Sequence, residues 1–141
     1  MKQDFDHKIS IVINRELPSW QVLNTVAHIS GYLGNVLGEQ FRTGDNFQTQ
    51  DGVLYPRNSQ YAIIVLSATA DQLSSFARSV REANDIQSMF FTREMIETTS
   101  DEEIMGELLN KTSNEIELLG VGIFGQNTRV KELTKQFKLW Q

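Results

Sequence analysis

Cysteine is absent from this chain of 141 residues, and histidine is nearly absent, with only His7 and His28. The first absence excludes disulfides, thiolate nucleophiles and thiolate metal ligands together. The two histidines lie far apart in the sequence. Carboxylates cluster at Asp101–Glu103, but the positive end of a helix that starts there accounts for such a cluster. We therefore expect no metal site.

Long apolar runs are also missing, since none approaches the ~20 residues that a membrane-spanning helix needs. The first eight residues, MKQDFDHK, are polar and of mixed charge, whereas a secretory signal needs a basic start and an apolar stretch. We therefore expect a cytoplasmic protein without a membrane partner. The net charge is −5, and an acidic surface repels phosphate backbones. Nucleic acid is an unlikely partner on that ground.

Four apolar segments of strand length alternate with helical patterns. They are Lys8–Asn14, Tyr61–Ser67, Ile86–Phe91 and Glu115–Phe124. Such alternation is typical of α/β proteins with helices on both faces of a mostly parallel or mixed sheet. The length suits one compact domain. We predict a single domain over residues 1–141, a three-layer α/β/α sandwich around a mixed four-stranded sheet.

The pattern of the first helix, within Pro18–Gly38, predicts which side chains face the sheet. Steps of three and four residues place one set on a common face. The expected inner face consists of Trp20, Leu23, Ala27, Ser30, Gly31 and Gly34.

Further signals position the later elements. The continuous apolar run Tyr61–Ser67 suits a central strand that is covered on both faces. Thr69 with Gln72 has the spacing of a capping box, as has Ser100 with Glu103. The helix that starts at Ser100 is expected to bury Ile104, Met105, Leu108 and Leu109.

A polar, glycine-rich segment, Glu39–Gln60, separates the first helix from the second strand. Loops of about twenty residues in compact domains are commonly functional or mobile. We expect a short ribbon at Gly52–Tyr55, and we expect part of the segment to cover a nearby crevice as a lid. A tolerated insertion without function is the alternative.

The string Gly120-Val-Gly122-Ile-Phe-Gly125 matches the dinucleotide-binding fingerprint literally. The fingerprint needs a second strand with an acidic ribose ligand about twenty residues later, and only a helix and a short tail remain before Gln141. The residues between the glycines are typical of a strand, and the glycines would let a helix pack closely. We therefore expect a strand here and no cofactor.

The two ends of the chain resemble the peptidyl-tRNA hydrolase II family. That family opens with a strand ending in Val-Val-Arg-x-Asp-Leu, and Ile11–Leu17 reads IVINREL, with Glu16 in place of the aspartate. It finishes with a strand like Val-Leu-Gly-Ile-Gly-Pro and a helix leading to Leu-Lys-Leu, to which Leu118–Ile123 and Phe137–Trp140 are similar. The resemblance implies a peptidyl-tRNA hydrolase II-like fold.

The same resemblance implies that the family's chemistry is mostly missing. The catalytic lysine of the family lies early on the first helix, in Gly-Lys-x-Ala-Ala-Gln, whereas this chain has no lysine between Lys8 and Lys111. Asn24 is the amide nearest to the family's glutamine. After the third strand the family has Asp-Ala-Gly-Arg-Thr, where this chain reads Thr92-Arg93-Glu94-Met95-Ile96.

The segment Arg15–Asn24, RELPSWQVLN, resembles more closely a group of short bacterial proteins, the domain-of-unknown-function family 2000. This group is related in fold to peptidyl-tRNA hydrolase II. The resemblance extends over nearly the whole chain. It implies the fold and no particular chemistry.

These observations predict a domain that binds a small ligand or a peptide. In open α/β sheets, ligands bind beyond the carboxyl ends of strands, where this chain has Asn14–Glu16 and Thr92–Glu94. Trp20 would form an apolar wall, Asn24 would donate and accept hydrogen bonds, and Arg15 or Arg93 would anchor a carboxylate or phosphate. The predicted ligand-binding residues, in one crevice, are Arg15, Glu16, Trp20, Asn24, His28, Thr92 and Arg93.

Two other functions remain open from the sequence. An esterase, an amidase or a peptidyl-tRNA hydrolase-like enzyme would use His28, Glu16 or Glu94 as its base, although no Gly-x-Ser-x-Gly nucleophile motif is present. A structural module that binds a protein partner is the other alternative, and a homodimer is compatible with it. A deep pocket at Glu16 or His28 would favour the enzyme, and a flat apolar patch would favour the module.

Overall fold

The structure is a computed structural model that describes residues 3–141. Residues 1 and 2, which belong to the predicted domain, lie outside the described residues. One five-stranded sheet with the order β5-β6-β1-β4-β7 forms the centre. The strands are β1 (Asp4–Asn14), β4 (Tyr61–Ala68), β5 (Gln87–Thr92), β6 (Leu118–Gln126) and β7 (Lys138–Leu139).

The sheet is mixed. β1 and β4 are parallel, β6 is antiparallel to its neighbours β1 and β5, and β7 is antiparallel to β4. The prediction of a mixed sheet with helices is therefore confirmed. The predicted number of four strands is wrong, because a two-residue strand such as β7 is too short to produce a periodic pattern.

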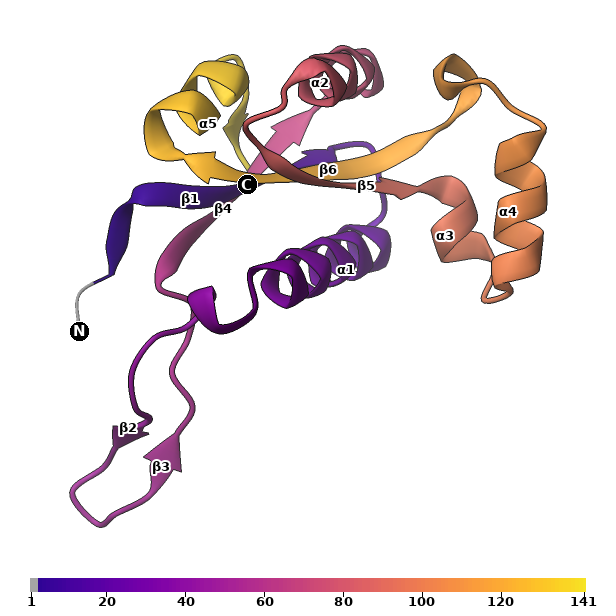
Figure 1. Ribbon diagram of the computed structural model, residues 1–141. Coiled ribbons are helices and arrows are strands. Elements are labelled where there is room, and N and C mark those ends of the chain that lie inside the picture. Colours follow the sequence, from indigo (N-terminus) through magenta and orange to yellow (C-terminus); the bar gives the residue numbers. More distant parts are fainter. Residues whose placement is uncertain (1–2) are drawn as a thin grey trace.

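Helices lie on both faces of this sheet. α1 (Ser19–Leu37) lies on one face, and α2 (Ala70–Glu82) and α5 (Asn127–Thr134) lie on the other (Figure 1). Side chains of β1 alternate between the two layers, with Ile11 packed on the α1 side and Val12 on the other side. Both faces of β1 are therefore covered.

The remaining helices are short. α3 (Arg93–Glu97) and α4 (Asp101–Leu109) follow β5 and project from its end (Figure 1). The single-turn 3-10 helices η1 (Gly38–Gln40) and η2 (Ser113–Glu115) precede the ribbon and β6. α4 has no buried residue, so the predicted burial of Ile104, Met105, Leu108 and Leu109 is wrong. Leu109 is 83% exposed, because no other element packs over the outer side of α4.

α1 turns a different face toward the sheet from the predicted one. Its buried residues are Val22, Thr25, Ile29, Leu33 and Leu37. Trp20 and Leu23, which were predicted to be inside, are 59% and 70% exposed. Apolar residues recur at helical spacing on both sides of α1, so the period alone does not choose between them. The branched side chains of the buried set fill the space above the sheet, and Trp20 and Leu23 face outward.

The glycines of β6 explain how closely α1 approaches. A Cβ at Gly120 would lie 2.7 Å from Ile13 and 2.8 Å from Thr25, and one at Gly122 would collide with Ile29. Both glycines lie within the strand, beneath α1. The prediction that they permit close helix packing is confirmed.

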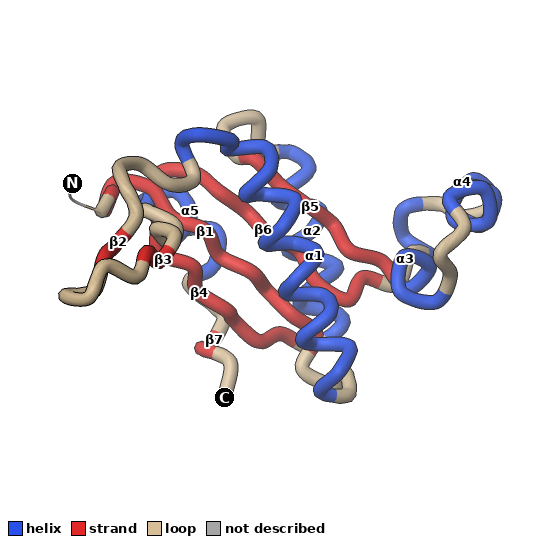
Figure 2. The backbone as a smooth tube through the Cα atoms, turned by 90° about the horizontal axis from the view of Figure 1, so that it is seen from below, coloured by secondary structure: helices blue, strands red, loops and turns tan. Residues whose placement is uncertain are grey.

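β4 is less covered than its sequence predicts. Only Leu66 and Ser67 pair with β7, so β4 is an edge strand over the rest of its length. None of the residues from Ala62 to Val65 is buried. Figure 2 shows that α1 crosses β5, β6 and β1 and leaves the first half of β4 open. The prediction of a strand covered on both faces is wrong.

Residues 43–58, called the arm below, form a two-stranded ribbon that projects from the body (Figure 1). Its strands are β2 (Phe47–Gln48) and β3 (Leu54–Tyr55). The base of the arm is fixed at the amino end of β1, because the Asp4 N–H donates to the Gln60 carbonyl. The expected crevice lies at the carboxyl ends of the strands, at the opposite end of the sheet. The arm therefore does not cover it as a lid.

Candidate functional site

The carboxyl ends of β1 and β5 lie at the same edge of the sheet. Ile13 of β1 and Phe91 of β5 both pair with Gly120 of the intervening strand. Arg15 and Arg93, which follow these strands, are consequently at one end of the sheet, as the sequence predicted. Their surroundings differ, however, and only one of the two cations is available to a ligand.

Arg93 is fully engaged within the protein. Its Nε and Nη2 donate to the two carboxylate oxygens of Glu117 at 3.2 and 2.9 Å, and its Nη1 donates to Gln21 Oε1 at 2.8 Å. The hydrogen bonds to Glu117 raise the pKa of Arg93 above its ordinary value. Arg93 thus joins the start of α3 to the residue before β6 and to the first turn of α1, and three of the five N–H donors of its guanidinium are used within the protein.

Glu94 and Thr92 lie beneath this contact. Glu94 is only 2% exposed, and its Oε1 accepts from Lys111 Nζ at 2.5 Å. Burial raises the pKa of Glu94, but the hydrogen bonds from Lys111 and from a backbone N–H lower it by more, so the net shift is downward. The nearby Thr92 hydroxyl adds to this lowering without reaching regular hydrogen-bond geometry, and both Oγ1 and Glu94 Oε2 remain unpartnered among the described residues.

Asn24 and His28 border an open hollow on the outer side of α1, called the His28 hollow. Its volume is about 560 Å³. The His28 ring stacks on Phe91, with the ring centroids 4.9 Å apart. The lining residues are Asn24, Ala27, His28, Gly31, Tyr32 and Met89. Trp20 is not among them, and neither are Arg15 and Glu16, which come directly after β1.

A second hollow lies at the carboxyl ends of β1 and β4, and we call it the Arg15 hollow. Its volume is about 350 Å³, and its lining residues are Arg15, Ser67, Lys138, Leu139, Trp140 and Gln141. The seven predicted residues are therefore divided between places: Asn24 and His28 line one hollow, and Arg15 lines the other. Glu16 is exposed beside Arg15, Thr92 is buried, and Arg93 is bound to other side chains of the protein.

Backbone pairing builds the Arg15 hollow. The Arg15 N–H donates to the Ala68 carbonyl at 2.9 Å, which holds the end of β1 against the end of β4. Lys138 pairs directly with Ser67, and the Trp140 N–H donates to the Val65 carbonyl at 3.0 Å. Residues two apart on a strand point to the same face, so Lys138 and Trp140 project on one side of β7, next to Ser67.

Two basic side chains, Arg15 and Lys138, line the Arg15 hollow. The closest carboxylate to the Arg15 guanidinium is that of Glu16, with Nε and Oε1 3.6 Å apart, and both side chains are more than half exposed. Lys138 makes no ion pair with any of residues 3–141. Exposed pairs of this kind contribute little. Arg15 and Lys138 are both free to bind an anion.

Sequence reasoning missed Ser67, Lys138 and Trp140. The segment Phe137–Trp140 was used only as a point of family resemblance, because it carries no strand pattern. The pairing of β7 with β4 places it at the site. The available signals were a lysine and an aromatic residue two positions apart, Lys138 and Trp140. Neither residue specifies which strand the segment will join.

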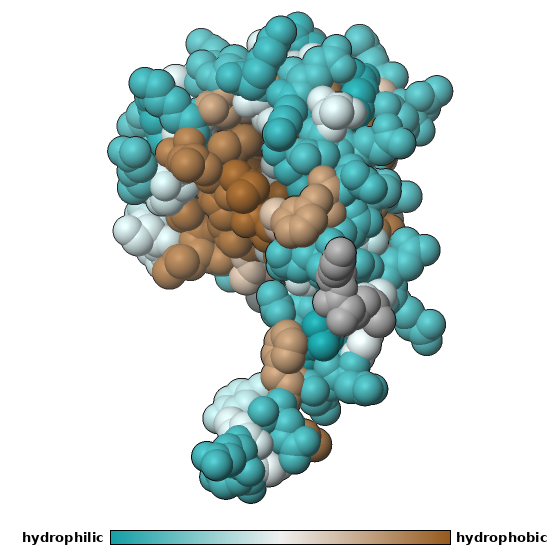
Figure 3. Space-filling model, turned by 90° about the vertical axis from the view of Figure 1, so that its left-hand side faces the viewer, coloured by the Kyte–Doolittle hydropathy of each residue, from teal (hydrophilic) through white to brown (hydrophobic). Residues whose placement is uncertain are grey.

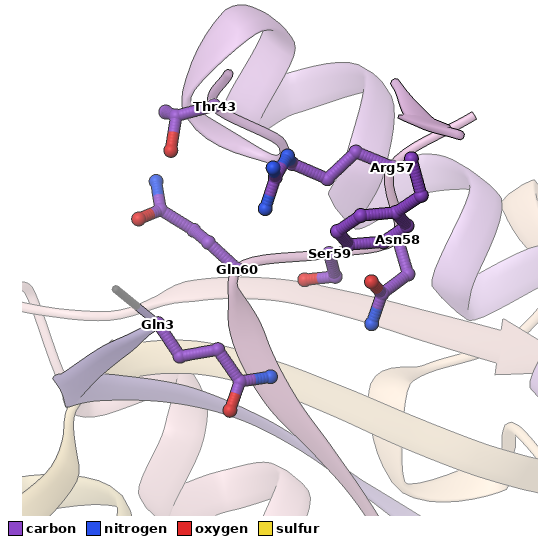
Figure 4. Close-up of a pocket in the computed structure, with 7 residues that line it drawn as sticks. Gln3, Thr43, Arg57, Asn58, Ser59 and Gln60 are labelled. Atoms are coloured by element: carbon purple, nitrogen blue, oxygen red, sulfur yellow. The ribbon is translucent and has the colours of Figure 1, made fainter. Parts of the chain in front are cut away.

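Another hollow, of about 280 Å³, lies at the base of the arm (Figure 4). Its polar groups hold the arm in place. Arg57 Nε donates to the Asp45 carbonyl and the guanidinium lies 4.4 Å from the centroid of the Phe47 ring. Gln60 Nε2 donates to the Gln40 carbonyl. This hollow is at the amino ends of β1 and β4, and we assign it no ligand.

Metal ligands and membrane spans were searched for in residues 3–141. No cluster of three or more His, Asp or Glu side chains in this part of the chain is placed to hold a metal ion. His7 Nδ1 lies 3.1 Å from Asp4 Oδ2, but this pair has no third partner of that kind. None of the helices described is both long and apolar enough to cross a membrane.

Comparisons with known proteins agree on the fold and name no activity. The family model "Protein of unknown function (DUF2000)" matches residues 7–141. A solved structure of a protein of unknown function from Agrobacterium tumefaciens strain C58 superimposes with a TM-score of 0.84. The two chains are 23% identical, and the match covers 98% of this chain and 100% of the other. A search of curated proteins found no significant match.

Proposed function

We propose that this chain, which belongs to the DUF2000 family of proteins of unknown function, is a cytoplasmic domain that binds a small organic anion in the Arg15 hollow. The ligand class is a carboxylate or phosphate attached to a flat apolar group. The anion would lie between Arg15 and Lys138, and the apolar group would lie against Trp140.

One observation carries the proposal: two cations without strong acidic partners border a hollow at the carboxyl ends of two parallel strands. This edge is where open α/β sheets commonly bind ligands. The Arg15 guanidinium offers a planar set of donors that matches a carboxylate or phosphate. Trp140 is half-buried, so its ring is rigid enough to serve as a wall while one side stays accessible.

The proposal also includes a more specific description of the fold. We infer a three-layer peptidyl-tRNA hydrolase II-like domain that binds rather than hydrolyses. The family resemblance at Ile11–Leu17 and Leu118–Ile123 supports the fold. The absence of lysine from residues 9–110 supports the loss of hydrolysis. Glu16 is exposed and the His28 hollow is open, so neither Glu16 nor His28 lies in an enclosed site. General-base catalysis depends on a side chain that is held in position against the substrate.

Tryptophan fluorescence tests the proposal. The chain contains two tryptophans, so Trp20→Phe leaves Trp140 as the single reporter at the hollow. This variant should be titrated with benzoate, phenyl phosphate and inorganic phosphate. We expect the aromatic anions to change the Trp140 emission in a saturable way, and more strongly than inorganic phosphate.

Charge-removing variants provide the specificity test. In the Trp20→Phe background, Arg15→Ala and Lys138→Ala should each weaken binding at least about tenfold, which corresponds to roughly 1.4 kcal/mol. Arg78→Ala is the matched control, because Arg78 is an exposed arginine on α2, which covers the other face of the sheet. Equal affinity in all three variants, or no saturable signal with any of the anions, contradicts the proposal.

A further inference from the structure

The arm carries an unusual amount of exposed apolar surface. Phe47, Val53, Leu54 and Tyr55 are each about half exposed, with fractions of 47%, 48%, 58% and 56%. Its two strands share only two residue pairs. A two-stranded ribbon of this size is at best marginally stable by itself in water. The arm therefore lacks a covering surface.

The body of the protein has a matching surface at β4. Ala62 to Val65 form an uninterrupted apolar run, which is typical of a strand covered on both faces, yet none of these residues is buried. Ile63 is 39% exposed. Figure 3 shows an apolar patch at the level of the sheet, on the side of the molecule from which the arm is also visible, extending below the body.

The edge of β4 is open at one residue. The Ser59 hydroxyl bonds both the N–H and the carbonyl of Tyr61, and the Val65 carbonyl accepts from Trp140. Backbone groups of alternate residues point to the same side of a strand. The N–H and the carbonyl of Ile63 must therefore face outward, between the hydrogen-bonded groups of Tyr61 and Val65. β7 does not extend far enough to pair with them.

We propose that the arm of one copy of this chain covers the β4 surface of a second copy, and that the second copy returns the same contact. Arm and patch lie on one face of the molecule, so a two-fold axis beside them brings each arm onto the other's β4. Such an isologous contact is self-complementary and closes as a dimer.

The available area fits a stable dimer. Phe47 pairs with Tyr55, and residues two apart point to the same face, so Phe47, Val53 and Tyr55 share one face of the arm. Their exposed parts present roughly 300 Å² of apolar surface, taking 150–250 Å² for a whole aromatic side chain. Two arms and the two surfaces that they cover then amount to about 1,200 Å², the lower end of the range for specific interfaces. The β4 run carries no charge, which also favours an apolar occupant such as the arm over a charged partner.

Mass measurement is the first test. Sedimentation or light scattering should give twice the 16.1 kDa of one chain. Tyr55→Asp on the arm and Ile63→Asp on β4 should each raise the dissociation constant of the dimer by roughly 100-fold or more, because each dimer loses two contacts. Leu109→Asp is the matched control, since Leu109 is 83% exposed on α4 and should leave the mass unchanged.

Disulfide trapping identifies the two surfaces directly. The chain has no cysteine, so Tyr55→Cys in one preparation and Ile63→Cys in another introduce one thiol each. When the two proteins are mixed and mildly oxidised, they should form a crosslinked heterodimer. A mixture of Leu109→Cys with Ile63→Cys should not form one. This result does not depend on how Ile63→Asp folds.

A monomeric wild-type protein at all concentrations would overturn the proposal, as would a dimer whose mass is unaffected by Tyr55→Asp. The same holds if the Tyr55→Cys and Ile63→Cys proteins do not crosslink above the Leu109→Cys control. These readouts are independent of anion binding, so failure here and failure of the proposed function are distinguishable.

Discussion

The Arg93 guanidinium donates to the side-chain oxygen of Gln21 across 2.8 Å, although the two residues are 72 positions apart in the sequence. The contact ties the end of β5 to the first turn of α1. Together with the bidentate pairing to Glu117, it makes Arg93 a structural residue, whereas Arg15 lines the Arg15 hollow and pairs only with the exposed Glu16.

Arg93→Ala should therefore destabilise the protein without abolishing anion binding. We expect the free energy of unfolding to fall by about 1.5–3 kcal/mol, the range for hydrogen bonds to charged groups. Arg15→Ala, which removes an exposed side chain, should change it by less than about 0.5 kcal/mol. Urea denaturation of the two variants measures the difference, and a larger loss for Arg15→Ala would contradict the assignment.

Replacement by alanine should change the free energy of unfolding in opposite directions at two glycines, Gly122 and Gly31. Gly122→Ala places a Cβ against Ile29 and Leu33 and should lower the free energy of unfolding by about 1–3 kcal/mol or more. Gly31→Ala adds a Cβ that meets no atom within 4 Å and should raise it by about 0.5–1 kcal/mol, since alanine favours helix. Thermal melts of both variants test this, and equal shifts would show that α1 packs differently.

Local signals in the sequence predicted local structure well. The capping box at Thr69 and Gln72 is present, with the Thr69 hydroxyl accepting from the Gln72 N–H at 3.2 Å and the Gln72 side chain accepting from the Thr69 N–H at 2.9 Å. The four long strands and the mixed sheet were also predicted. In each of these cases the determining interactions lie within a few residues or within one strong apolar run.

Features decided by distant partners could not be predicted. The inner face of α1 depends on the glycines of β6 about 90 positions away, and the helix is apolar on more than one side. The exposure of β4 follows from the position that α1 takes over the sheet, which no single segment encodes. The Arg15 hollow needs β7, whose two residues pair with β4 from the far end of the chain. The sequence therefore predicted Arg15 but missed Lys138 and Trp140.

The buried Glu94 should make stability depend on pH. Its pKa in the folded protein lies below the ordinary value of 4.5, so folding favours the ionised form. The resulting stabilisation is fully present above pH 4.5 and is lost as the pH falls through the folded-state pKa. Glu94→Gln should lower the free energy of unfolding by about 1–3 kcal/mol at neutral pH.

The difference in the free energy of unfolding between wild type and Glu94→Gln should narrow below pH 4.5, because the carboxyl group of the wild type becomes protonated there. Denaturation at pH 7, pH 5 and pH 3.5 measures it. Glu97→Gln is the matched control. Glu97 is exposed, and its Oε1 lies as far as 3.8 Å from Arg93 Nε, so this ion pair is weak. A gap that is constant with pH would contradict the lowered pKa of Glu94.

Purified protein should not release peptide from peptidyl-tRNA above background. Hydrolysis of the ester develops negative charge on the carbonyl oxygen, which needs preorganised donors or cations. The family resemblance assigns that task to a lysine on the first helix, and this chain has no lysine between Lys8 and Lys111. Arg93 does not replace it, because its donors are bound to Glu117 and Gln21.

The net charge of −5 further opposes docking of tRNA. The assay should compare the wild type with Arg15→Ala and His28→Ala, using a genuine peptidyl-tRNA hydrolase as the positive control. We expect all three preparations to match the rate without enzyme. Turnover that co-purifies with the wild type and is lost in either variant would assign a catalytic function to this edge of the sheet, and the binding proposal would then have to give way to the hydrolase.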